Sequence, residues 1–177
     1  MTKRSVPTRT LSDRPNLDQL KRQAKELLEA FRNGNAAAVK EVHAHYWGAS
    51  LSSFELHDAQ LVHARAYGFD SWPKLKAFVD GANVARLVDA VKAGDLESAR
   101  SLLKVRPELA GMSQSNFGIL HFAVLQNAAE MVRLLMRHGA NARDGVYPHR
   151  DATTAHEIAA HRGYTEIVRI IEEEEQK

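Results

Sequence analysis

Five alanines along the chain each stand four residues before a residue that can break a helix, and this spacing constrains the fold most. The breaking residue is glycine in four copies and asparagine in the other. The copies are Ala30–Gly34, Ala64–Gly68, Ala90–Gly94, Ala123–Asn127 and Ala159–Gly163, so the alanines are 34, 26, 33 and 36 residues apart. A small residue lets two helices approach closely, and glycine readily takes the positive φ that ends a helix. The pattern predicts an array of helical hairpins.

The fourth copy shows what one hairpin of this array should contain. Residues 119–126 and 130–138 each carry apolar side chains at helical spacing, and Gly139 follows the second segment as a helix-ending residue. Neither segment is long enough to form a stable helix by itself. We therefore expect two short helices that are stabilised by similar pairs on both sides.

The second half of the chain resembles the ankyrin-repeat family, whose repeats contain two short helices at a period near 33. The segment Ile119-Leu120-His121-Phe122-Ala123 resembles the family's Pro-Leu-His-x-Ala, and residues 134–141 resemble its Leu-Leu-Leu-x-x-Gly-Ala-Asp. Residues 154–168 are similar to a further copy, and residues 90–97 to a truncated first one. The resemblance covers about Asn83 to Glu173 and implies repeats at about 83–112, 113–145 and 146–175. Gly118, Asn127 and His156 depart from the family pattern, which indicates irregular repeats.

These observations predict an all-α fold, an α-solenoid of helical hairpins in which about three ankyrin-like repeats follow two irregular helical hairpins. Residues 1–15 are basic and polar without periodicity, so we expect an extended or disordered arm. Residues 16–82 are expected to form a helical region that caps the repeats, because an end repeat exposes an apolar face. Residues 83–177 form the predicted ankyrin-repeat region.

Within residues 16–82, helices are predicted at about 17–33, 36–46 and 54–67, and from Ser71 to near Asp80-Gly81. Asn16 and Ser71 are residue types that cap helix N-termini, and Pro73 suits a first turn. At the other end of the chain, residues 172–175 are all glutamate. Negative charge opposes the dipole at a helix C-terminus, so we expect this end of the last helix to fray.

The composition excludes several classes of function. The chain has 177 residues, 44% of them apolar, and no cysteine, so it contains neither disulfides nor thiolate zinc sites. No apolar run approaches membrane-spanning length and no hydrophobic signal core begins the chain, so we expect a cytoplasmic protein without a membrane partner. A net charge of +2 without a visibly basic face gives no argument for nucleic-acid binding. We expect no cofactor and, by default, a monomer.

The resemblance implies that another protein is held on a concave face, which consists of the finger loops and the exposed end of each repeat's first helix. Carried over by position, the predicted partner-binding residues are Lys92 (with Ala93 beside it), Leu125, Gln126, Tyr147, His149, Arg150, Asp151, His161 and Arg162. This mixture of apolar, amide and cationic groups suits a moderately apolar interface, and tyrosine and arginine are enriched at interaction hot spots.

Two further expectations concern this face. The second finger, which contains residues 147–151, is three residues longer than the period, and a proline-stiffened loop of ordinary surface residues explains it nearly as well as a binding loop. Phe117 is expected to pack under the first finger. The resemblance also implies that His121 is structural and ties adjacent turns together through hydrogen bonds.

The alternative is a small-molecule site or an enzyme beside the extended finger loop. Its candidate groups are His121, Tyr147, His149, Asp151, His156 and Glu157. A His–Asp or His–Glu pair could perform acid–base chemistry, but no nucleophile elbow, phosphate-binding glycine loop or dinucleotide fingerprint accompanies these residues. The spacing of the histidines on the predicted helices suits metal chelation poorly. We therefore predict a non-catalytic binding module without a metal site.

Overall fold

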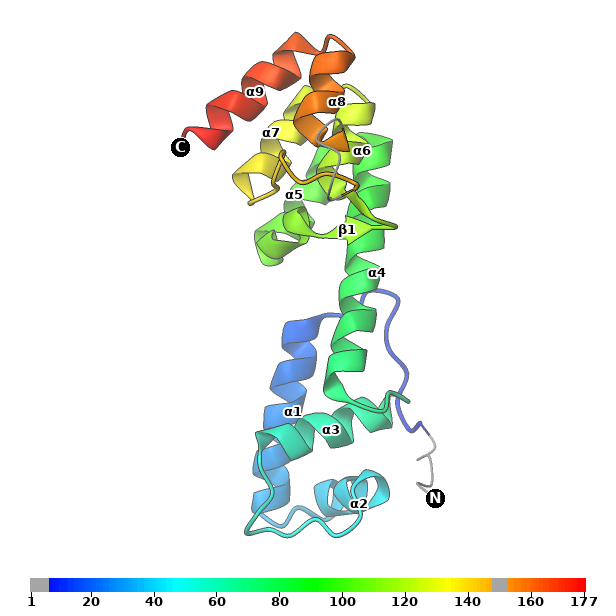
Figure 1. Ribbon diagram of the computed structural model, residues 1–177. Helices are drawn as coiled ribbons and strands as arrows, with labels where there is room; N and C mark the ends of the chain where they lie inside the picture. Colours follow the sequence, from blue (N-terminus) through cyan, green and yellow to red (C-terminus); the bar gives the residue numbers. More distant parts are fainter. Residues whose placement is uncertain (1–6, 148–152) are drawn as a thin grey trace. The chain divides into compact units, whose positions relative to one another are not determined.

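The computed structural model describes residues 7–147 and 153–177, which are mostly helical (Figure 1). The chain divides into two compact units, residues 1–82 and residues 83–177. They are called the N-terminal and C-terminal units below. Helix α4 (Trp72–Ala93) contributes residues to both units. The predicted all-α class is confirmed, and none of the described helices combines the length and apolar composition that crossing a bilayer requires.

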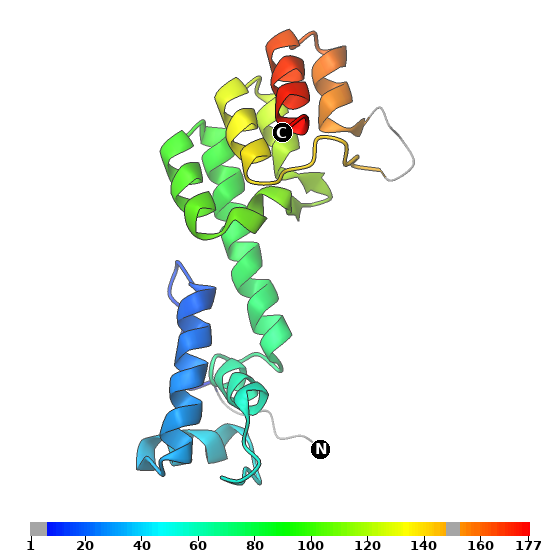
Figure 2. The same ribbon diagram turned by 90° about the vertical axis from the view of Figure 1, so that its left-hand side faces the viewer.

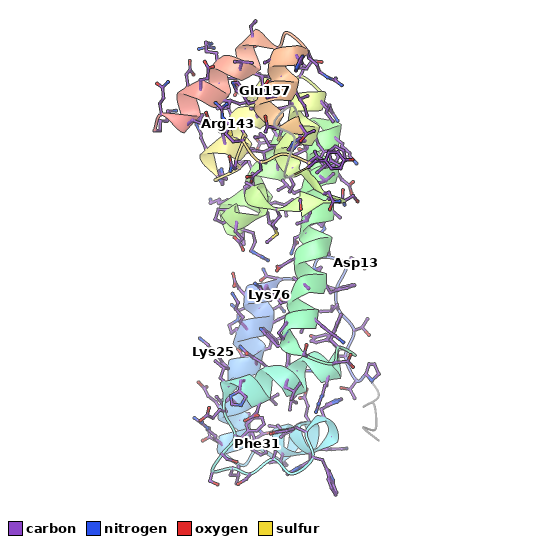
Figure 3. The ribbon with its side chains drawn as sticks, viewed as in Figure 1. Asp13, Lys25, Phe31, Lys76, Arg143 and Glu157 are labelled. Carbon is purple, nitrogen blue, oxygen red and sulfur yellow. The ribbon has the colours of Figure 1, made fainter. Side chains whose placement is uncertain are left out.

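The N-terminal unit contains α1 (Leu17–Arg32), α2 (Ala36–His45), α3 (Leu56–Ala66) and the first part of α4. Asn16 begins α1 as predicted, because its side-chain oxygen accepts hydrogen bonds from the N–H groups of Asp18 and Gln19 at 2.9 and 3.0 Å. Phe31 lies among the helices, whereas Lys25 points outward from α1 (Figure 3). The rings of Phe31 and Phe54 lie 4.5 Å apart and centre one of two apolar clusters in this unit.

The described part of the N-terminal arm is irregular but makes specific contacts. The N–H groups of Thr8 and Arg9 both donate to the carbonyl oxygen of Ala66, at 2.8 and 2.9 Å. The Arg9 guanidinium lies 2.8 Å from a carboxylate oxygen of Glu41, and Leu11 packs on one of the apolar clusters. The arm therefore supplies a partner to a carbonyl at the end of α3, which a helix terminus leaves unsatisfied.

A fully buried histidine, His63 on α3, lies in the same unit. Its Nε2 lies 3.2 Å from Oε1 of Gln23, and its ring packs edge-on against Tyr67. An amide oxygen accepts only, so Nε2 carries the hydrogen. Burial, with a smaller contribution from the charge of Arg9, lowers the pKa of His63 to about 4. The side chain is therefore neutral near pH 7.

The predicted breaks all have the same backbone geometry. The φ angles of Gly34, Gly68, Gly94, Asn127 and Gly163 are 69°, 85°, 68°, 53° and 69°. In each copy the N–H of the residue after the break donates to the carbonyl of the alanine, at 2.9 to 3.0 Å. The breaking residue itself donates to the carbonyl three residues earlier. These two bonds define a Schellman motif, so the prediction that these positions end the first helix of each pair is confirmed.

The predicted helix end at Asp80-Gly81 is wrong, because α4 continues without a break to Ala93. A glycine inside a helix costs about 1 kcal/mol relative to alanine, which does not by itself end the helix. The residue directly after Gly81 is alanine, which neither breaks a helix nor caps a new one. The neighbouring turns bury Val79 and Val84, and this burial favours the helical conformation on both sides.

The C-terminal unit is a stack of helix pairs, as Figure 2 shows. The end of α4 pairs with α5 (Leu96–Val105), α6 (Ile119–Leu125) with α7 (Ala129–Arg137), and α8 (Ala155–His161) with α9 (Thr165–Glu175). A 3-10 turn (Pro107–Gly111) follows α5. A single apolar core extends through all three pairs, from Val84 to Ile171. The predicted solenoid of ankyrin-like hairpins is confirmed.

The first finger is a short antiparallel hairpin between α5 and α6. Strand β1 (Ser113–Gln114) pairs with β2 (Phe117–Gly118), and the two residues between them, Ser115 and Asn116, have φ angles of 51° and 70°. Two consecutive positive φ values define the tight turn that matches the twist of a two-residue hairpin. The turn fixes where Phe117 emerges relative to α6.

Helix α9 does not fray at its glutamates as predicted, because arginines from earlier in the chain pair with them. Arg143 donates two hydrogen bonds to the carboxylate of Glu175, at 2.9 and 2.7 Å, and Arg137 donates to Glu174 at 3.2 Å. The Arg143 hydrogen bond lowers the pKa of Glu175. Arg143 precedes Glu175 by 32 residues, and Arg137 precedes Glu174 by 37. Because the negative charges are paired, α9 remains helical to Glu175.

The break geometry predicts opposite effects of one substitution at two glycines. Gly94→Ala should lower the free energy of unfolding by about 1 kcal/mol, because alanine is strained at positive φ. Gly81→Ala should raise it by about 1 kcal/mol, because Gly81 lies inside a helix. Neither added methyl group meets an atom within 4 Å, so packing does not obscure the comparison. Urea denaturation followed by circular dichroism measures both, and changes of the same sign would contradict the assignment.

The burial of His63 predicts that acid destabilises the N-terminal unit. The folded pKa of about 4 lies below the ordinary value of 6.5, so protonation favours the unfolded chain. The contribution of His63 is complete above pH 6.5 and falls by about 3 kcal/mol as the pH drops to 4. His63→Gln should remove this component from the pH dependence of denaturant unfolding. The same substitution at the exposed His43 should leave it unchanged, and equal effects would refute the interpretation.

Candidate functional site

The helix positions predicted for the concave face all lie exposed beside a break. Lys92 and Ala93 end α4, Leu125 and Gln126 end α6, and His161 and Arg162 end α8. The left-handed residue follows at once or after one further residue, so each pair lies where the first helix of its repeat ends. The repeat therefore presents these side chains at equivalent places along the C-terminal unit.

His121 connects α6 to the second finger. Its ring is buried, and Nε2 lies 3.0 Å from the carbonyl oxygen of Thr153. A carbonyl only accepts, so Nε2 carries the hydrogen and donates. The bond joins residues 32 positions apart, in two successive repeats. This contact gives His121 the structural role that the family resemblance implied.

Gly118 accounts for one irregularity beside His121. At the equivalent place in the next repeat, the Thr154 hydroxyl accepts a hydrogen bond from the N–H of Glu157 at 3.1 Å and caps α8. Gly118 has no side chain to do this for α6. A Cβ at Gly118 would lie 3.1 Å from Nδ1 of His121, so the ring occupies the space that a side chain would need.

An aromatic platform lies on the exposed side of α6 and the first finger. The rings of Phe117 and Phe122 are 6.0 Å apart, and the ammonium of Lys92 lies 4.7 Å from the Phe122 ring centre. Leu125 follows Phe122 by three residues and therefore shares its helix face. Phe117 also packs edge-on against His121, yet 37% of its surface is exposed. The expectation that Phe117 is hidden under the finger is only partly right.

The second finger is described at its base. Gly145 and Thr154 form an antiparallel bridge, and the N–H of Val146 donates to the Thr153 carbonyl at 3.4 Å. The N–H of Tyr147 donates to the Thr153 hydroxyl at 3.3 Å, while 58% of the Tyr147 surface is exposed. Three further predicted binding residues, His149, Arg150 and Asp151, lie outside the described residues.

The candidate acid–base residues have different neighbours. His156 lies on α8 with its ring nitrogens 3.7 Å from carboxylate oxygens of Glu157 and Glu172. His121 instead bonds to the backbone of the second finger. No described contact joins these two histidines, and no described group of three His, Asp or Glu residues could hold a metal ion. His149 and Asp151 lie outside the described residues, so the alternative of a catalytic site beside the long finger stays untested.

The comparison with family models identifies the repeats. A model described as ankyrin repeats, in three copies, matches residues 87–177, just over half of the chain. The protein belongs to the ankyrin-repeat family. Ankyrin repeats are generally protein–protein interaction modules. Comparisons with curated proteins and with solved structures gave no match.

Sequence reasoning missed Phe122 as a surface residue. The carried-over positions were the two residues next to each break, and Phe122 lies one helical turn earlier. Its spacing of three residues from Leu125 was a sufficient signal, because residues three apart in a helix are neighbours on one face. The equivalent residues in the other repeats are Asp89 and Ile158, so the platform belongs to the middle repeat alone.

The contact between His121 and Thr153 predicts a large difference between two histidines. His121→Ala should lower the free energy of unfolding by about 2–3 kcal/mol, because it creates a cavity and removes the donor to a carbonyl. His161→Ala changes an exposed residue and should stay within about 0.5 kcal/mol. Denaturant unfolding of both variants checks this, and comparable losses would exclude a special role for His121.

Proposed function

We propose that this protein is a non-catalytic interaction module that holds another protein on the concave face of its C-terminal unit. The proposed contact residues are those predicted from the sequence, together with Phe117 and Phe122. The main support is the distribution of exposed large apolar side chains. Among the described residues of this unit they are Val105, Phe117, Leu125 and Tyr147, and all except Val105 lie on the segments of the proposed concave face.

This distribution favours a binding surface for a physical reason. Large apolar side chains gain free energy when they leave water, and clustered ones mark sites where a partner covers them. Leu125 and Phe117 lie in adjoining segments, and Tyr147 is rigid and amphipathic, as many interface anchors are. Exposed cationic and amide groups at the neighbouring helix ends, including Gln126 and Arg162, supply the polar rim of the proposed interface.

Three further parts of the proposal come from the sequence. Residues 16–82 act as a cap for the N-terminal end of the repeats, the protein is cytoplasmic, and it is a monomer before it binds. These three points stay predictions.

Affinity capture with two charge-introducing variants tests the proposed face. Leu125→Arg places a charge on the concave face, and Val105→Arg makes the same change at an exposed apolar residue at the end of α5. Partner proteins captured from the native lysate by the unmodified chain should be reduced at least about tenfold by Leu125→Arg. Val105→Arg should leave capture unchanged, and circular dichroism should show that both variants are folded.

Two outcomes would count against this assignment. Capture that survives in both the Leu125→Arg variant and the Tyr147→Ala variant would show that the partner binds elsewhere. Loss of capture by Val105→Arg alone would place the interface on the second helices of the repeats instead.

A further inference from the structure

The aromatic platform includes the cation of Lys92. The ammonium of Lys92 lies over the Phe122 ring and forms no ion pair with a described carboxylate. An ammonium over an aromatic ring is weakly stabilised and retains hydrogen-bond donors for a further partner. Lys92 is therefore placed to bind an anion while its methylene chain and the ring form apolar surface.

Several other cations of the C-terminal unit have intramolecular partners. Arg137 and Arg143 pair with glutamates at the end of α9, and Arg133 lies 3.4 Å from both Glu173 and Glu174. These pairs neutralise the side of the unit where α7 and α9 lie. The positive charge that remains available for a partner includes Lys92 at the platform and Arg162 at the end of α8, which forms no described ion pair.

One carboxylate, that of Asp89, adds negative charge near the cation of Lys92. Asp89 is exposed on α4, three residues before Lys92, and the repeat register places it beside Phe122. An incoming carboxylate is repelled by Asp89 and attracted by Lys92, so the two charges select its position along α4. The platform is therefore polarised, with its positive end toward the break at Gly94.

We propose, resting on the function proposed above, that the partner inserts a short segment in which an apolar side chain is flanked by carboxylates. The apolar side chain covers Phe117, Phe122 and Leu125, and one carboxylate pairs with Lys92. Burial of the rings supplies affinity, and the ion pair supplies selectivity for an acidic segment over a basic one.

Two synthetic peptide pools test this inference with the full-length protein. Both pools have a central Leu, Phe or Trp, flanked by glutamates in one pool and by lysines in the other, and binding is measured by fluorescence anisotropy. The protein should prefer the acidic pool by about fivefold, the size expected of one partly exposed ion pair, and added salt should weaken the preference. Asp89→Asn should strengthen it.

Charge-reversal variants separate the platform from general electrostatics. Lys92→Glu should reverse the preference toward the basic pool, and Leu125→Ser should weaken binding of both pools equally. Lys104→Glu makes the same change of net charge at an exposed lysine on α5 and should leave the preference unchanged. Equal effects of Lys92→Glu and Lys104→Glu, or equal binding of the two pools, would overturn the inference.

The failure of this inference is distinguishable from failure of the proposed function. If neither pool binds but partner capture still depends on Leu125, the face recognises a folded surface and the segment proposal is wrong. If capture does not depend on Leu125, the proposed function fails first.

Discussion

The Schellman turn that follows each repeated alanine is the interaction on which the rest of the fold depends. At all five positions a left-handed residue turns the chain, and the next N–H returns to the alanine carbonyl at 2.9 to 3.0 Å. The turn satisfies carbonyls that the helix end would otherwise leave unpaired. It also places the second helix of each pair against the first. Because the two hairpins of the N-terminal unit use the same turn, one local rule shapes both units.

Side-chain contacts also connect successive helix pairs, as the contact between His63 and Gln23 does in the N-terminal unit. His121 bonds to the backbone of the following repeat, and Arg143 pairs with Glu175. These contacts fix where the fingers and the helix ends lie, because they join segments about 32 residues apart in the sequence. In the function proposed above, the helix ends and fingers held by these contacts display the side chains that a partner binds.

Local features of the structure could be predicted from the sequence, because their causes lie within a few residues. The breaks, the cap at Asn16 and most helix limits depend on residue types at short spacing. The continuity of α4 through Gly81 could not be predicted in this way, because burial on both sides outweighs a weak local preference. The stable end of α9 was missed for a similar reason: its arginine partners lie 32 to 41 residues earlier.

The candidate site shows the same division between local and distant causes. Lys92, Leu125 and Arg162 follow from the repeat register, and the structure places all of them on the surface. The platform of Phe117 and Phe122 depends on a hairpin turn with two positive φ angles, neither of which is at a glycine. Sequence spacing alone did not reveal that turn. The repeat register therefore predicts which positions are exposed at the candidate site. Which side chains contact one another there depends on the packing, which the sequence alone did not reveal.

Hydrogen–deuterium exchange of the full-length chain, with and without a captured partner, tests the central claim most directly. Stacked helix pairs that display one binding face predict slower exchange in residues 86–93, 113–126 and 142–162 when the partner is bound. Exchange in α5, α7 and the N-terminal unit should remain unchanged. Protection confined to those segments instead, with none in the fingers or first helices, would contradict the account.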